Sequence, residues 1–283
     1  MLWGNPACFP ALGLLLWSLS VSSLAAQQPV EDEATRLAKA TQNPVADLVS
    51  LPFQFNFNNG GGLDDRTFFN LNFQPVVPIK GVLENWTIIA RTIVPYVNLP
   101  SGPDSRSGGL GDIQEQIFFT PAQSGSIIWG VGPIFSIPTA TADAVRTGSW
   151  AFGPTAVVLT SRGPWVIGGL LNNLWTFSDE GDDTEVNQFL VQPFINYNFG
   201  KGWALATAPI ITANWDAPDG EEWTLPIGAG ITKTTVFNGR PMSVGFQYYH
   251  NVEHPTASGA NLLRVIVSLL YPSRPKPKAD ATP

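Results

Sequence analysis

The sequence predicts an all-β protein, a transmembrane outer-membrane antiparallel β-barrel of about twelve strands. Three observations predict this fold. From Leu51 onward the apolar pattern has a period of two, as strands with one apolar face require. Charged residues make up only 13% of the chain, although the apolar fraction of 44% is ordinary. Tryptophans recur near the predicted strand ends, where membrane barrels carry their aromatic belts.

The stretch from Trp203 to Trp215 shows the repeating unit most clearly. Its residues alternate between two faces, a tight turn at 200–202 precedes it, and an acidic loop at 216–222 follows it. Twelve steps of about 3.3 Å at a tilt of about 40° rise about 30 Å, the hydrocarbon thickness of a bilayer. We therefore predict one unbroken strand here, with Asn214 on the inner face.

Both ends of the chain are predicted to lie outside the barrel. Residues 1–26 indicate a secretory signal peptide, because an apolar run ends in the small-x-small sequence Ser23-Leu24-Ala25. A membrane anchor is the alternative interpretation. The chain's one cysteine, Cys8, would leave with the signal, so the mature protein would have no disulfide or thiolate chemistry. The Pro- and Lys-rich tail, 272–283, is predicted to be disordered.

Residues 27–50 form the one region with helical character. Acidic residues stand near its start, apolar residues follow at helical spacing, and Pro44 is expected to end the helix. This segment is either a solvated periplasmic arm or a plug in the mouth of the barrel.

The predicted barrel spans residues 51–271. Arg91 decides the register of the strand that begins at Trp86, because an arginine facing lipid at mid-strand would cost about 2–4 kcal/mol. The same reasoning leaves Glu115 facing outward in the next strand. We expect either a bulge that shifts the register or a position near the membrane interface.

Eight further strands follow, at about 126–137, 149–160, 164–177, 187–199, 202–215, 223–233, 241–251 and 261–271. Short turns at 123–125, 161–163, 200–202 and 238–240 alternate with longer loops, and Asn238-Gly239 is a strong hairpin pattern. Short turns of outer-membrane barrels face the periplasm and long loops face outside. The sequence therefore predicts both chain ends on the periplasmic side.

Inward positions of these strands are rich in carboxamides, with few charges. Carboxamides both donate and accept hydrogen bonds, so they could guide neutral polar solutes, or they could bond to one another and seal a narrow lumen. The candidate lumen residues are Gln54, Asn56, Asn70, Asn72, Gln74, Arg91, Asp112, Gln114, Gln116, Gln188, Gln192, Asn196, Asn214, Gln247 and Arg264.

Charge limits the choice of partners. The net charge of −7 and the lack of basic patches argue against nucleic acid. The expected partners are outer-membrane lipids, lipopolysaccharide and a small solute, with no cofactor. Acidic residues gather in the long loops, so the outer rim should favour neutral or cationic solutes. They are Asp64, Asp65, Asp182, Asp183, Asp219, Glu221 and Glu222.

No catalytic or metal site is expected. The acidic loop 179–185 could hold Ca²⁺, but a solvated loop is the simpler interpretation. His250, His254, Ser258 and Asn251 lie close together in sequence, yet no spacing fixes a lipase-like geometry. We interpret them as loop and strand residues of a protein that is not an enzyme.

Several short phrases resemble one bacterial family. They are Gln42-Asn43-Pro44-Val45-Ala46, Asp64-Asp65-Arg66, Gly109-Leu110-Gly111-Asp112, Gly163-Pro164-Trp165, Asn187-Gln188-Phe189 and Pro209 through Trp215. Over roughly residues 37–271 the chain resembles outer-membrane transporters linked by name to the meta-cleavage pathway of phenol degradation, often mislabelled neuromedin U. The resemblance implies a β-barrel in the cell outer membrane that passes small solutes, including aromatic compounds. It implies no catalytic residues.

Overall fold

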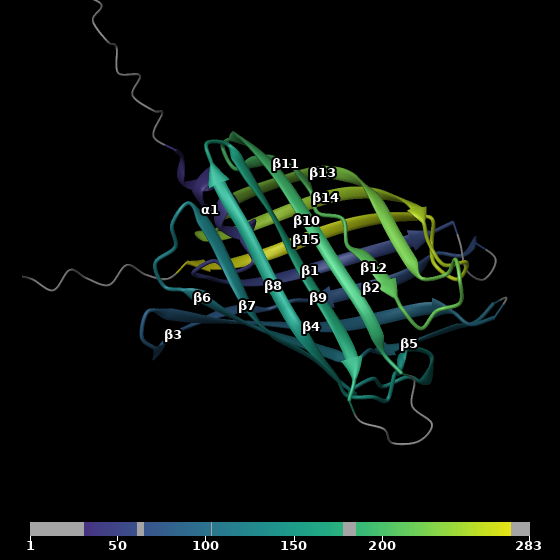
Figure 1. Cartoon of the computed structure of the whole chain (residues 1–283). Helices are drawn as coiled ribbons and strands as arrows, with labels where there is room; N and C mark the ends of the chain where they lie inside the picture. The colour runs from purple at the N-terminus through teal and green to yellow at the C-terminus, as the bar shows by residue number, and fades with distance from the viewer. Residues whose placement is uncertain (1–30, 61–64, 103, 178–184, 273–283) are drawn as a thin grey trace, which may run out of the picture. The chain divides into compact units, whose positions relative to one another are not determined.

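The computed structural model describes residues 31–60, 65–102, 104–177 and 185–272 (Figure 1). The predicted signal peptide lies outside the described residues, as do the tail beyond residue 272 and the acidic residues Asp64, Asp182 and Asp183. No helix in the described part of the chain is long and apolar enough to cross a membrane.

In the described residues, fifteen strand segments form one antiparallel sheet. They are β1 (Leu48–Asn59), β2 (Phe68–Phe73), β3 (Val76–Leu83), β4 (Trp86–Pro100), β5 (Arg106–Leu110), β6 (Ile113–Pro121), β7 (Ile127–Ile137), β8 (Ala151–Arg162), β9 (Trp165–Thr176), β10 (Asn187–Gly200), β11 (Trp203–Thr207), β12 (Ile211–Asn214), β13 (Trp223–Phe237), β14 (Arg240–Glu253) and β15 (Asn261–Pro272). A single α-helix, α1 (Glu33–Thr41), and a short 3₁₀ turn, η2 (Asp143–Val145), are the helical elements of the described residues.

The sheet closes into a barrel of twelve strands, because three pairs of segments are interrupted single strands. These pairs are β2 with β3, β5 with β6, and β11 with β12. Strand β15 pairs with β1, and β10 joins β9 to β11 and β12, so the ladder runs around the barrel. The predicted twelve-stranded antiparallel barrel is confirmed.

Each strand divides its side chains between an apolar outside and a buried inside. On β8, Phe152 and Val158 are exposed, whereas Val157 and Leu159 are buried. Seven of the eight tryptophans beyond residue 30 are 36–47% exposed on the outer face. Trp86 contacts Trp129 near one end at 5.8 Å between ring centroids, and Trp215 contacts Trp223 near the other end at 5.5 Å. This arrangement gives the two aromatic belts of a membrane barrel.

The two ends of the barrel differ in the length of their connections. At the short-turn end, Asn238 and Gly239 have φ values of 49° and 74°, which identifies the type I′ turn expected of an Asn-Gly hairpin. Longer loops, at 138–150, 177–186, 215–222 and 254–260, join the strands at the long-loop end. Both β1 and β15 meet the chain ends at the short-turn end.

The prediction of one unbroken strand at 203–215 is wrong, because β11 stops at Thr207 and β12 starts at Ile211. Pro209 has no N–H to donate to a ladder. The neighbouring Ala208 N–H donates instead to the Tyr249 hydroxyl at 2.9 Å, and the Ala208 carbonyl accepts from Arg264 Nη1 at 3.1 Å. Lumen side chains therefore replace the missing ladder bonds.

The interruption leaves the register of the strand unchanged. Strand β10 pairs Ile195 with Thr207 before the break and Val191 with Ile211 after it, in the same frame. The inner and outer faces of β12 are therefore those that the alternation predicts.

Glu115 faces outward without a bulge, so the expected shift of register is wrong, whereas the alternative position near the membrane interface stays a prediction. The β4–β6 ladder is regular from Trp86 opposite Pro121 to Ile93 opposite Gln114. Glu115 lies opposite Thr92 on β4 and opposite Phe135 on β7. The Thr92 hydroxyl donates to Glu115 Oε2 at 2.6 Å and so satisfies part of the outward carboxylate.

Strand shortens two connections near β4. Strand β3 continues to Leu83, so only Glu84-Asn85 join it to β4, and Lys80 on β3 forms an ion pair with Asp47. Strand β5 pairs with the end of β4.

Helix α1 is shorter than the predicted helical region. Asp32 caps its N-terminus by accepting from Thr35 N at 3.0 Å, and Gln42 is the C-cap. Leu37 and Ala38 are buried on the face that packs against the barrel. The helix contacts β10, β11, β13, β14 and β1.

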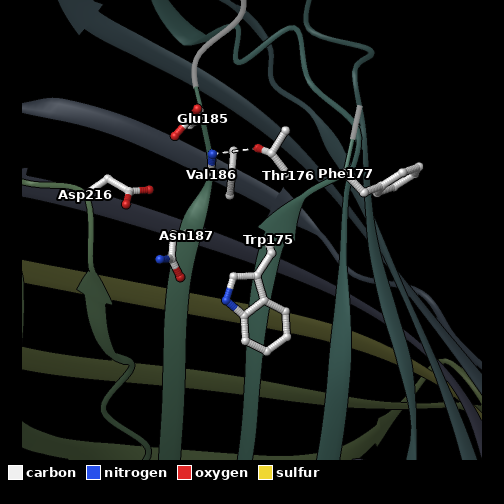
Figure 2. Close-up of a pocket in the computed structure, with 7 residues that line it drawn as sticks. All are labelled: Trp175, Thr176, Phe177, Glu185, Val186, Asn187 and Asp216. Carbon is white, nitrogen blue, oxygen red and sulfur yellow. Dashed lines mark hydrogen bonds between the residues drawn. The ribbon is translucent and has the colours of Figure 1, made fainter. Parts of the chain in front are cut away.

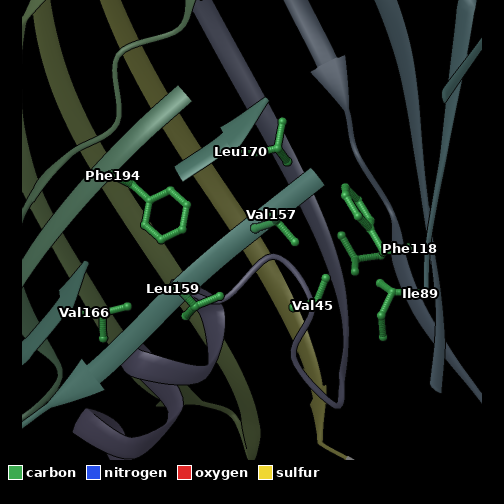
Figure 3. Close-up of a cluster of buried hydrophobic side chains, with 9 residues drawn as sticks. Val45, Ile89, Phe118, Val157, Leu159, Val166, Leu170 and Phe194 are labelled. Carbon is green, nitrogen blue, oxygen red and sulfur yellow. The ribbon is translucent and has the colours of Figure 1, made fainter. Parts of the chain in front are cut away.

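The apolar core lies inside the barrel. Val45, just after α1, packs with buried residues from β3, β4, β6, β8, β9 and β10, as Figure 3 shows for most of them. Gly168 makes room on β9, because a Cβ there would lie 2.6 Å from Phe194 Cζ. The members of this core cluster are Val45, Val76, Ile89, Phe118, Val157, Leu159, Val166, Leu170 and Phe194.

Candidate lumen and solute site

The structure places the predicted lumen residues on the inner faces of the strands but at different depths. Most lie in the interior. Gln188 and Asn214 face each other across β10 and β12 and are exposed at the long-loop end. The interior residues are Gln54, Asn56, Asn70, Asn72, Gln74, Arg91, Gln114, Gln116, Gln192, Asn196, Gln247 and Arg264.

Arg91 is held by two glutamines on neighbouring strands. Its Nη1 donates to Gln116 Oε1 and its Nη2 to Gln74 Oε1, both at 2.8 Å. Strand pairing explains the geometry, since Arg91 lies directly opposite Gln116 on β6 and beside β3, which follows Gln74. The guanidinium is therefore fixed within the lumen.

Arg264 is the centre of a second polar cluster. Its Nε donates to Asn56 Oδ1 at 3.1 Å, and Asn56 Nδ2 donates to Asn70 Oδ1 at 3.0 Å. The guanidinium carbon lies 5.0 Å from the ring centroid of Tyr249, which is fully buried. Arg264 thus links the inner face of β1 to the break between β11 and β12.

Neither lumen arginine has a carboxylate partner among the described residues, where the ion pairs are Lys39–Glu31 and Lys80–Asp47. Asp112, the predicted inward carboxylate, instead organises the loop at 138–150. It accepts from the backbone nitrogens of Thr139, Ala140 and Thr147 at 3.0–3.1 Å. The lumen therefore carries excess positive charge, although the chain as a whole is acidic.

Three cavities lie along the lumen between the described residues. The lower cavity, about 190 Å³, lies between the segment after α1 and Arg91. The upper cavity, about 220 Å³, lies between Arg91 and Asp112. The side cavity, about 190 Å³, lies between Gln42 and Gln247. Gln192 lines all three, and Arg91 separates the lower cavity from the upper one.

Sequence reasoning missed the apolar part of the lumen wall. The core cluster fills the short-turn half, and Ile93, Leu190 and Ile210 line the upper cavity beside the amides. The register had already placed Ile89 on the same face as Arg91, and Phe118 on the same face as Gln116. These apolar wall residues could have been predicted by assigning every second residue of each strand to the inner face, instead of only the polar ones.

The N-terminal segment is attached to the short-turn end of the lumen by polar contacts. Gln42 and Asn198 exchange two amide hydrogen bonds of 3.0 Å, and Lys39 Nζ donates to the Gly163 carbonyl at 2.7 Å. Asp32 Oδ2 accepts from Lys201 N at 2.9 Å. Hydrogen bonds from the Thr35 hydroxyl, then from Lys201 N and then from Thr35 N hold the pKa of Asp32 below its ordinary value of 3.8.

A separate acidic pocket of about 330 Å³ lies at the long-loop end, outside the lumen (Figure 2). Glu185 and Asp216 supply its carboxylates beside Trp175, and Val186 N donates to Thr176 Oγ1 at 2.7 Å. It belongs to the acidic rim that the sequence predicts.

Glu221 joins two of the long loops on this rim. Its carboxylate accepts from the Thr256 hydroxyl and from Thr256 N, both at 2.5 Å. These bonds hold the pKa of Glu221 below its ordinary value of 4.5.

The histidine group does not assemble into a catalytic arrangement within the described residues. His250 is exposed and its Nδ1 lies 3.1 Å from Asn261 Oδ1, whereas Asn251 is buried and donates to the Gly259 carbonyl. Consecutive strand residues point to opposite faces of β14. Among the described residues, no three His, Cys, Asp or Glu side chains are grouped to hold a metal ion.

Comparison with known proteins gives similarity at the level of the fold. No family model and no curated protein matches the sequence. The structure is similar to the COG4313 outer membrane channel from Pseudomonas putida F1, with a TM-score of 0.59 and 13% identity over 79% of this chain and 94% of that one. It is also similar to the NanC porin, with a TM-score of 0.50 and 8% identity over 78% and 98% of the two chains. The closed twelve-stranded fold with its two aromatic belts identifies this protein as an outer-membrane β-barrel.

Proposed function

We propose that the protein is a passive outer-membrane channel for small solutes, including neutral polar and aromatic compounds. One observation carries the proposal. The lumen contains cavities on both sides of Arg91, and carboxamide side chains line them at successive depths. A solute moving along this path exchanges hydrogen bonds with one amide after another, so no single position holds it strongly.

The comparisons support a channel, because the two similar structures named above are described as a channel and a porin. The resemblance to transporters linked with the phenol meta-pathway supports aromatic compounds as solutes. We propose no enzymatic activity, since His250 and Asn251 face opposite sides of β14. Lipids around the belts and lipopolysaccharide at the rim are the proposed partners.

A closed barrel with a structural role is the second candidate. The core cluster around Val45 favours it, because this cluster and α1 fill the short-turn half of the lumen. The two candidates differ in one measurable property, the passage of ions and small solutes.

Conductance of the folded protein in planar bilayers tests the proposal. We expect small channels for the whole chain and a higher conductance for a variant lacking residues 27–41, because that variant loses α1. A variant lacking residues 273–283, after the last strand, serves as the control and should conduct like the whole chain. A folded barrel that never conducts, with or without residues 27–41, would establish the closed barrel instead.

A further inference from the structure

The interior of the barrel offers hydrogen-bond donors and positive charge at one level. Arg91 has five N–H donors, and its hydrogen bonds within the described residues go to two carbonyl oxygens, Gln74 Oε1 and Gln116 Oε1. Part of its donor capacity therefore remains for a ligand in the cavities that it lines.

The guanidinium also orients the glutamines around it. A guanidinium can only donate, so each glutamine must present its oxygen to Arg91. The amide nitrogens of Gln74 and Gln116 are then directed away from Arg91, and both side chains line the upper cavity. The result is a site rich in donors, which favours a negatively charged ligand.

The charges around this site do not cancel. Asp112 lines the same cavity, but its two oxygens accept from the loop backbone at 138–150 and form no ion pair with Arg91. Arg264, the other arginine of the lumen, donates to Asn56 and to the Ala208 carbonyl. An anion near Arg91 would compensate a buried positive charge that the described residues leave uncompensated.

Part of the remaining wall of the upper cavity is apolar. Ile93, Pro95, Leu190 and Ile210 supply this part, and Asn72, Gln114 and Gln192 line the cavity beside them. A volume of about 220 Å³ is below the range of drug-sized sites, so the ligand must be small. The cavity thus combines a charged donor cluster with a short apolar surface.

We propose that the upper cavity binds small monocarboxylates with an apolar body, the carboxylate on the Arg91 guanidinium and the body against Leu190 and Ile210. This inference rests on the proposed channel function and names the class of solute. The planar guanidinium matches a carboxylate through two parallel N–H···O bonds. The carboxamide side chains in the cavities on both sides of Arg91 would hydrogen-bond to the solute as it moves along the lumen.

Equilibrium binding to the whole folded protein in detergent micelles tests the site without requiring transport. Isothermal titration uses three probes of similar shape: benzoate, neutral benzamide and cationic benzylammonium. We expect benzoate to bind roughly ten- to a hundredfold more tightly than benzamide, the factor supplied by a charge-assisted hydrogen bond, and benzylammonium to bind least.

Substitutions at arginine locate the site. Arg91→Gln should remove the preference for benzoate over benzamide, and Arg91→Lys should keep a smaller preference, because it retains the charge but loses the planar fork. Arg162→Gln, at the exposed short-turn end of β8, makes the same charge change outside the lumen and should bind benzoate as the unaltered protein does. Equal binding of benzoate and benzamide by the unaltered protein, or an unchanged preference in Arg91→Gln, would overturn the proposal.

Ion conductance in potassium chloride separates this inference from the channel function. A protein that conducts but does not prefer benzoate retains the channel and refutes the site. A protein that binds benzoate at Arg91 but never conducts supports the site and refutes the channel.

Discussion

Single charged residues have different partners on the inner and outer faces of this barrel. Inside, Arg91 donates to two carboxamide oxygens, and Arg264 donates to one carboxamide oxygen and one backbone carbonyl, none of which neutralises the charge. Outside, Glu115 stands among apolar side chains with one hydroxyl partner, Thr92. An arginine inside the barrel has several polar side chains around it, whereas the outward carboxylate of Glu115 has the Thr92 hydroxyl on the neighbouring strand.

Replacing Glu115 with leucine should therefore stabilise the barrel. Acidic side chains on the lipid face cost less than basic ones but still destabilise, so we expect a gain of about 1–2 kcal/mol in the free energy of unfolding. Urea unfolding in lipid vesicles measures this change. Glu253→Leu, at the exposed long-loop end of β14, is the control and should have little effect. A lower stability of Glu115→Leu would show that the Thr92 bond outweighs the cost of exposure to lipid.

Asp32 predicts a pH dependence of the N-terminal segment. Its carboxylate pKa is depressed in the folded protein, chiefly by the Thr35 hydroxyl bond, so it stabilises the segment above its ordinary pKa of 3.8. That contribution is lost as the pH falls below 3.8 and through the depressed value. Hydrogen-exchange protection of α1 should therefore weaken in acid, and Asp32→Ala should weaken it at neutral pH and remove the Asp32 part of the acid response. An identical acid response in Asp32→Ala would exclude this carboxylate as the cause.

At the scale of elements, the interrupted strand β11–β12 depends on hydrogen bonds from side chains inside the barrel. The break leaves the backbone of Ala208 without ladder partners, and Tyr249, Arg264 and Gln192 bond to it instead. A fully buried backbone group without a partner costs about 1–3 kcal/mol. The break is therefore stable only because β14, β15 and β10 present these side chains at the same level.

Tyr249→Phe should destabilise the barrel by about 1–3 kcal/mol, because it leaves the Ala208 N–H without its acceptor. The change keeps the volume of the ring, so packing is retained. Tyr248→Phe on the exposed face of the same strand is the matched control, and its loss of a bond to Asn261 should be nearly neutral. Urea unfolding in vesicles compares the two, and equal effects would argue against a special role for Tyr249.

At the scale of the whole molecule, an acidic rim and a basic lumen lie in series. Asp219, Glu221 and Glu222 stand in the loop at 215–222, and Glu185 and Asp216 line the rim pocket. Charges on the rim act over about a Debye length, roughly 8 Å at physiological salt, whereas Arg91 acts on a solute already inside. The rim therefore influences access, and the lumen influences affinity.

Neutralising the rim should alter ion preference only at low ionic strength. In Asp219→Asn combined with Glu222→Gln, we expect the reversal potential in a salt gradient to shift toward anions at about 0.01 M and to stay unchanged at about 1 M, where the Debye length is about 3 Å. The control combines Glu84→Gln with Glu33→Gln. It also removes two negative charges, but at the short-turn end of the barrel. An unchanged potential at low salt would assign selectivity to the lumen alone.

The sequence by itself determined the features that repeat along single strands. Alternation from Leu51, the tryptophan pairs and the turn residues specified the twelve strands and the position of each side chain inside or outside, including Arg91 and Arg264. These features are local, because a strand's two faces follow from a period of two and membrane interfaces select tryptophan.

Only the tertiary structure decided which residues from distant strands contact one another inside the barrel. Closure brings Arg264 to the Ala208 carbonyl and Val45 to Phe118, contacts between residues far apart in the chain that no periodicity encodes. The same closure allowed Pro209 to interrupt a strand, because side chains from other strands supplied the missing hydrogen bonds. It also left Glu115 outward in a regular register, because Thr92 on the neighbouring strand gave its carboxylate a partner that the sequence of β6 does not contain.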